Sequence, residues 1–92
     1  MSARTTYDRP KRAEGVRLVR QDGVAYLNDS DGAQLLALND TAAALWELCD
    51  GRTSVDEMAA AAASLFDASP ERISADVAET VSRLRSVGAL QP

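Results

Sequence analysis

The spacing of apolar residues changes at Asn39, and this change limits the possible folds of the 92-residue chain more than any other feature. Three short runs that suit β-strands come first, at residues 16–21, 24–28 and 33–38. Asp22-Gly23 separates the first two, and the turn-forming residues 29–32 separate the second from the third. Residues 16–38 are therefore predicted to form a small antiparallel meander.

The segment after Asn39 is predicted to form a helix with the only cysteine of the chain on its buried side. Asn39 or Asp40 can cap this helix, because their side-chain oxygens accept hydrogen bonds from free backbone N–H groups. The apolar residues at helical spacing are Ala42, Leu45, Trp46 and Cys49, and the helix ends before Gly51. A free cysteine on such a face packs as a small hydrophobic group, so we interpret Cys49 as a core residue rather than a nucleophile.

Two further helices follow. Ser54 and Glu57 have the spacing of a capping box. The apolar face of that second helix is predicted to comprise Val55, Met58, Ala61, Ala62, Leu65 and Phe66. The last helix is predicted to begin at Ser69-Pro70, or alternatively nearer Ser74 or Asp76. Its apolar stripe comprises Ile73, Val77, Val81 and Leu84, and Gly88 ends it.

Together these elements predict an α+β fold of the winged helix-turn-helix type, with a three-stranded antiparallel sheet followed by three helices. Residues 1–21 carry six basic and two acidic groups, a net charge of +4, which leaves −8 for the rest of a chain whose total is −4. We predict that residues 1–15 form a flexible basic N-terminal arm and that residues 16–92 form one domain. So acidic a body repels phosphate backbones, and nucleic acid is not the predicted partner.

The absence of histidine removes several classes of function. Neither Ser–His–Asp and Cys–His nucleophiles nor imidazole metal sites can be built without it. A single cysteine forms no internal disulfide and no structural zinc site. No apolar run reaches the roughly 20 residues of a membrane span or resembles a signal peptide. We therefore predict a cytoplasmic, non-catalytic protein with no metal site and no cofactor.

The runs LNDTAAALWELCDGRTSVDEM and ADVAETVSRLRSVGAL resemble the PqqD-like family, also called RiPP recognition elements after ribosomally made, post-translationally modified peptides. The resemblance covers about residues 16–90. It implies a peptide-binding chaperone that holds the leader segment of a precursor peptide by adding it as a strand to the third strand, beside the last helix. A modifying enzyme, such as a leader peptidase, a cyclase or a radical S-adenosylmethionine (SAM) protein, then acts on the core peptide.

The implied peptide-binding residues lie on two elements. On the third strand they are Ala33, Gln34, Leu35, Leu36, Ala37 and Leu38. On the last helix they are Arg72, Asp76, Val77, Thr80, Val81, Arg83 and Leu84. Alternation puts Leu36 with Leu38 on the core side and leaves Leu35 and Ala37 on the side that would receive the leader. Either Thr80 or Val81 borders the groove, since they lie on opposite flanks of the buried stripe.

Two departures from the family pattern bear on the type of peptide. Thr80 stands where many relatives carry a large apolar residue, which implies a shallower or more polar pocket. Residues 29–32 differ from the Pro-Glu turn common in proteins of pyrroloquinoline quinone assembly and lean slightly towards the wider group of relatives, such as those of lasso-peptide systems, which leaves the class of peptide open. The competing hypotheses are a DNA-binding winged-helix regulator and a structural or enzyme-subunit domain without leader affinity.

Overall fold

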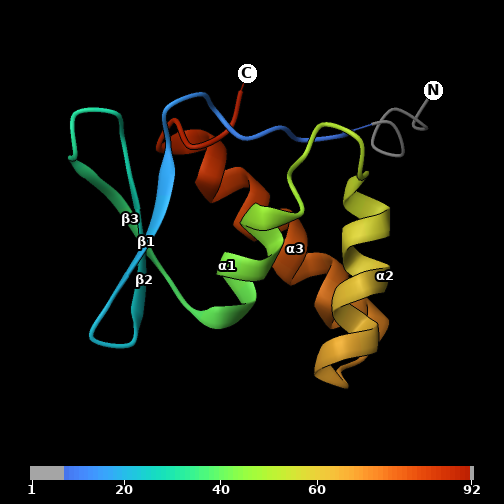
Figure 1. Cartoon of the computed structure of the whole chain (residues 1–92). Helices are drawn as coiled ribbons and strands as arrows, with labels where there is room; N and C mark the ends of the chain where they lie inside the picture. Colours follow the sequence, from blue (N-terminus) through green and yellow to red (C-terminus); the bar gives the residue numbers. More distant parts are fainter. Residues whose placement is uncertain (1–7, 92) are drawn as a thin grey trace.

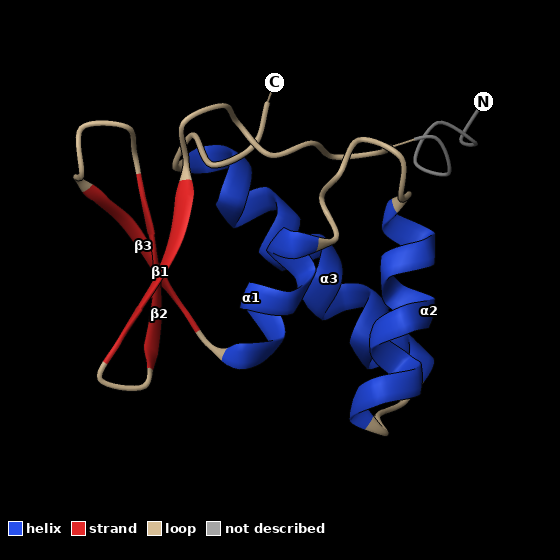
Figure 2. Ribbon diagram, in the orientation of Figure 1, coloured by secondary structure: helices blue, strands red, loops and turns tan. Residues whose placement is uncertain are grey.

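The computed structural model describes residues 8–91 and contains three strands followed by three helices (Figure 1; Figure 2). The strands are β1 (Arg17–Gln21), β2 (Val24–Asn28) and β3 (Gln34–Leu38). The helices are α1 (Asp40–Glu47), α2 (Val55–Phe66) and α3 (Pro70–Ser86). This order confirms the predicted α+β fold.

The sheet is antiparallel in the order β1-β2-β3. Asp22 and Gly23 both have positive φ (54° and 80°), as a two-residue hairpin turn of the favoured hand requires. The register shifts between Leu27 and Asn28, so that Leu27 pairs with Leu36 whereas Asn28 pairs with Gln34. Leu35 is therefore the extra residue of a bulge.

Side-chain caps fix where each helix starts. Asn39 accepts a hydrogen bond from the Ala42 N–H (2.8 Å) at the start of α1. Ser54 and Glu57 exchange the two hydrogen bonds of a capping box, at 2.8 and 3.1 Å. Ser69 accepts from the Arg72 N–H, so α3 starts at Pro70, and the alternative start nearer Ser74 or Asp76 is wrong.

The core lies between the inner face of the sheet and the three helices, with α2 packed mainly against α3 (Figure 1). Its fully buried large side chains are Leu27, Leu45, Cys49, Met58, Val77 and Leu84. The Cys49 thiol donates a hydrogen bond to the Leu45 carbonyl at 3.3 Å, and burial raises its pKa to about 11. A buried, protonated thiol is a packing group, which confirms the interpretation of Cys49.

The predicted apolar face of α2 is wrong in part. Ala61 is exposed and Leu65 is 73% exposed, whereas Ala59 joins Met58 and Ala62 in the core. The Phe66 side chain lies outside the described part of the chain. The face is rotated because α2 packs mainly against α3, and spacing alone does not show which side of an alanine-rich helix that partner will cover.

The first described residues of the predicted arm make backbone hydrogen bonds to the folded domain. The Gly51 N–H donates to the Pro10 carbonyl (2.9 Å), and the Arg12 N–H donates to the Cys49 carbonyl (2.9 Å). The Ala13 N–H donates to the Ala89 carbonyl at 3.0 Å. Residues 8–13, here called the N-terminal segment, thus run between the α1–α2 loop and the C-terminal end of the chain (Figure 1). The rest of the predicted arm, residues 1–7, lies outside the described residues.

Candidate functional site

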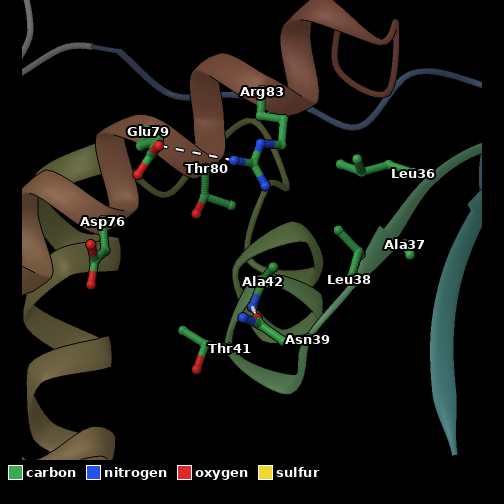
Figure 3. A pocket seen from close by; sticks show the side chains of 10 residues that line it. All are labelled: Leu36, Ala37, Leu38, Asn39, Thr41, Ala42, Asp76, Glu79, Thr80 and Arg83. Carbon is green, nitrogen blue, oxygen red and sulfur yellow. Dashed lines mark hydrogen bonds and ion pairs between the residues drawn. The ribbon is translucent and has the colours of Figure 1, made fainter.

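A groove of about 360 Å³ lies between β3, the start of α1 and one flank of α3 (Figure 3). Its lining from β3 and α1 comprises Leu36, Ala37, Leu38, Asn39, Thr41 and Ala42. Its lining from α3 comprises Asp76, Glu79, Thr80 and Arg83. We call it the β3–α3 groove.

One wall of this groove is an open sheet edge. Among residues 8–91, β3 pairs only with β2, so the outer side of β3 is an edge of the sheet. Every second residue of such an edge directs its N–H and C=O away from the sheet, where another strand can pair with them. β3 has the sequence QLLAL, without the lysine or proline that commonly protects an edge. The groove therefore combines a backbone ladder with side-chain contacts.

The predicted strand residues divide into two groups. Leu36, Ala37 and Leu38 line the groove. Ala33 and Gln34 are exposed and lie outside its lining. Leu35 is half-buried and also lies outside, which differs from the expectation that it faces the peptide. The bulge is the physical reason, because its extra residue interrupts the alternation from which that expectation came.

The predicted helix residues divide in the same way. Asp76, Thr80 and Arg83 line the groove, so the Thr80 flank rather than the Val81 flank borders it. The buried stripe of α3 supports the wall from behind without lining it: Val77, Val81 and Leu84. Arg72 is exposed at the start of α3 and also lies outside the lining.

Four lining residues were not predicted: Asn39, Thr41, Ala42 and Glu79. The first three follow β3 directly, and the chain turns there from the open edge into α1. The turn from β3 into α1 could have indicated these lining residues, because a guest strand longer than β3 must pass the first turn of α1. Glu79 stands four residues before Arg83, a spacing that places both on one helix face.

The helical wall of the groove is polar, as the Thr80 departure implied. Arg83 and Glu79 approach to 3.9 Å while their side chains stay 61% and 72% exposed. Exposed pairs at this spacing contribute only about 0.3–0.5 kcal/mol. With Asp76 added, the three charged side chains of the lining sum to −1. The groove therefore offers weakly engaged charges of both signs.

A smaller cavity of about 230 Å³ lies on the opposite flank of α3. It is lined by Asp8, Val55, Ala78, Val81, Ser82 and Arg85. Arg85 donates two hydrogen bonds to the Asp8 carboxylate, at 2.6 and 3.2 Å, and this pairing raises the pKa of Arg85. The Val55 N–H donates to the Asp8 carbonyl at 3.0 Å. On this side of α3, the N-terminal segment is therefore already bound to the Arg85 guanidinium and to the Val55 N–H.

The described residues hold no group of three or more acidic or cysteine side chains placed to bind a metal ion. Across residues 8–91, no helix has both the length and the apolar character needed to cross a membrane. The β3–α3 groove can accept an extended chain through its edge and its side chains.

In the comparison with protein families, the model described as "Coenzyme PQQ synthesis protein D (PqqD)" matches residues 25–90. This range begins in β2 and includes β3, all three helices and the whole lining of the β3–α3 groove. Comparisons with curated proteins and with solved structures found no match. The chain therefore belongs to the PqqD family, whose proteins are non-catalytic peptide-binding chaperones that work with a modifying enzyme.

Proposed function

We propose that this protein binds the leader region of a ribosomal precursor peptide as an additional strand on β3, in the β3–α3 groove. The bound leader presents its core peptide to a modifying enzyme of a lasso-type or radical SAM pathway. The observation that carries the proposal is the open edge of β3 directly beside a groove. In strand addition, main-chain hydrogen bonds supply affinity and alternate side chains supply selectivity.

The turn between β2 and β3 supports the lasso-type assignment within this proposal. The Asp29 carboxylate accepts hydrogen bonds from the N–H groups of Asp31 and Ala33, each at 2.9 Å. Gly32 completes the turn at a φ of 86°. This turn is built by an aspartate and a glycine, and it differs from the Pro-Glu turn that the resemblance associates with pyrroloquinoline quinone assembly.

The test is direct binding of the leader segment of the cognate precursor peptide. Fluorescence polarisation with the fluorescein-labelled leader should give a Kd between nanomolar and micromolar, roughly −12 to −8 kcal/mol. A scrambled leader is the matched control. No binding of the true leader at tens of micromolar would reject the proposal.

Hydrogen exchange tests the mode of binding independently. Amides on the outer side of β3 should exchange more slowly with leader bound, because strand addition gives them partners. Amides of β1, the other edge of the sheet, serve as the internal control and should not change. Protection of β1 instead of β3 would contradict the proposed docking edge.

A further inference from the structure

The charges of the β3–α3 groove are separated along its length. Arg83 lies at the end near Leu36, whereas Asp76 lies seven residues earlier on α3, towards Thr41 (Figure 3). Glu79 and Thr80 lie between them (Figure 3). The groove therefore has a cationic end beside the middle of β3 and an anionic end beside the start of α1.

Both end charges can take a new partner. Among the described residues, Arg83 has one ion-pair partner, Glu79, at 3.9 Å, and both side chains are largely exposed. A guest carboxylate could replace Glu79 at little cost, because exposed pairs are weak. Asp76 makes no ion pair and no side-chain hydrogen bond with the described residues. Arg85, two residues beyond Arg83, differs because Asp8 already holds its guanidinium at 2.6 Å.

The geometry sets the spacing of the matching charges in a guest strand. Seven residues of α-helix span about 10.5 Å. A strand advances about 3.4 Å per residue, so positions two and four apart on one face are separated by about 7 and 14 Å. Two charged side chains that face α3 together therefore stand two or four positions apart, and side chains at odd spacing face opposite sides of the strand.

The direction of β3 sets their order. β3 runs from the Arg83 end of the groove towards the Asp76 end, since Leu36 precedes Asn39 and Thr41 in the chain. The existing sheet is antiparallel, and antiparallel pairs are slightly more stable per residue. An antiparallel guest enters at Asp76 and leaves past Arg83.

We infer that the β3–α3 groove selects peptide segments in which a basic residue precedes an acidic residue by two or four positions. The basic side chain pairs with Asp76 and the acidic side chain pairs with Arg83. This inference rests on the proposed function and adds to it the charge order and orientation of the peptide. Charge pairs of this kind discriminate between partners through the cost of placing like charges together.

The test is selection of a displayed library of random 14-residue peptides on the immobilised full chain. The same selection is made on the double variant Asp76→Lys, Arg83→Glu, which reverses the polarity of the groove and keeps the net charge. A second double variant, Arg17→Glu with Asp31→Lys, makes a matched exchange at exposed residues outside the groove. Circular dichroism confirms that each protein is folded before selection.

The expected result has three parts. The unmodified protein enriches basic-before-acidic peptides at a spacing of two or four, the groove variant enriches the opposite order, and the Arg17/Asp31 variant behaves like the unmodified protein. Peptides enriched on the unmodified protein should bind the groove variant at least tenfold more weakly in fluorescence polarisation.

Failure of the inference and failure of the proposed function give different outcomes. Enriched peptides that bind β3 but follow no charge order, or whose order is the same on both groove polarities, overturn the inference and leave leader binding intact. The inference is also overturned if the charge order reverses between the two groove polarities in peptides whose basic and acidic residues stand an odd number of positions apart. Such side chains face opposite sides of the strand and cannot both contact α3. A library from which no peptide is enriched overturns the inference, and the polarisation assay with the true leader then decides the proposed function separately.

Discussion

The two flanks of α3 carry arginines only two residues apart, yet these arginines have opposite surroundings. On one flank, Asp8 of the N-terminal segment pairs with Arg85 and lines the cavity beside it, with Asp8 32% and Arg85 40% exposed. On the other flank, Arg83 has Glu79 at 3.9 Å as its only ion-pair partner within residues 8–91, and it lines the groove beside the open edge of β3. The Arg85 flank is bound by Asp8, whereas the Arg83 flank lies beside a strand edge that no element of residues 8–91 pairs with.

This difference shows what makes one face of a helix available to a guest. Both flanks have arginines, small side chains and a cavity, so residue type does not separate them. The N-terminal segment supplies both a carboxylate and a backbone carbonyl to the Arg85 flank. Within residues 8–91, no element pairs with the outer edge of β3 on the Arg83 flank. Availability is decided by which segment is already bound.

The largest expected effect comes from filling one flank or the other. Thr80→Trp places a ring in the β3–α3 groove and should weaken leader binding at least 30-fold, about 2 kcal/mol, because the guest strand loses its space. Ser82→Trp, two residues away, fills the opposite cavity and is the matched control. Fluorescence polarisation with labelled leader measures both. Equal effects of the two variants would show that the flanks do not differ in function.

A core substitution should weaken folding without distinguishing the flanks. Cys49→Ala removes a fully buried sulfur and should lower the free energy of unfolding by about 1–2 kcal/mol. Leader affinity of the folded variant should be unchanged, because Cys49 lies outside the groove lining. Urea unfolding followed by the fluorescence of the buried Trp46 gives the stability. Loss of binding at unchanged stability would show that Cys49 contributes to the site.

The two arginines should separate stability from binding. Arg85→Ala removes a bidentate pair with Asp8 and should cost about 0.5–1 kcal/mol of stability, discounted for its partial exposure. Arg83→Ala should leave stability within about 0.5 kcal/mol and weaken leader binding instead. Paired urea titrations and polarisation assays measure these changes. The reverse assignment would contradict the comparison.

The smallest expected effect is an alkaline loss of stability that comes from the shared core. Folding raises the Cys49 pKa from an ordinary 9.0 to about 11, so the unfolded state releases the thiol proton first. The stabilisation by the protonated thiol is complete below pH 9 and is lost as pH rises towards 11. At pH 9 the expected loss is a few tenths of a kcal/mol. Urea midpoints at pH 7 and pH 9 should shift less in Cys49→Ala than in the unmodified protein.

Much of the fold could be predicted because its signals are local. Asn39, Ser54 and Ser69 cap the helices at the positions that their spacing indicated. The stripe from Ile73 to Leu84 is buried as its periodicity indicated. The α2 face was predicted less well, since an alanine-rich helix is apolar on several sides and only its contact with α3 selects one.

The candidate site could be predicted to the level of its elements but not of its individual side chains. β3 and α3 do border one groove, with Asp76, Thr80 and Arg83 in its wall. Leu35 lies outside the groove lining, and its position could not be predicted, because a bulge is a property of the pairing between two strands. Glu79 becomes a neighbour of β3 only through the docking of α3, whereas Thr41 already follows β3 closely in the chain.

The sequence by itself determined the order of the elements, their caps and the burial of Cys49, because each depends on residues within one or two turns of chain. The tertiary structure alone decided which flank of α3 stays open. That choice depends on Asp8, which meets Arg85 across 77 residues of chain. Contacts over such separations leave no periodic trace in the sequence, since they arise only when the N-terminal segment and the C-terminal helix pack together.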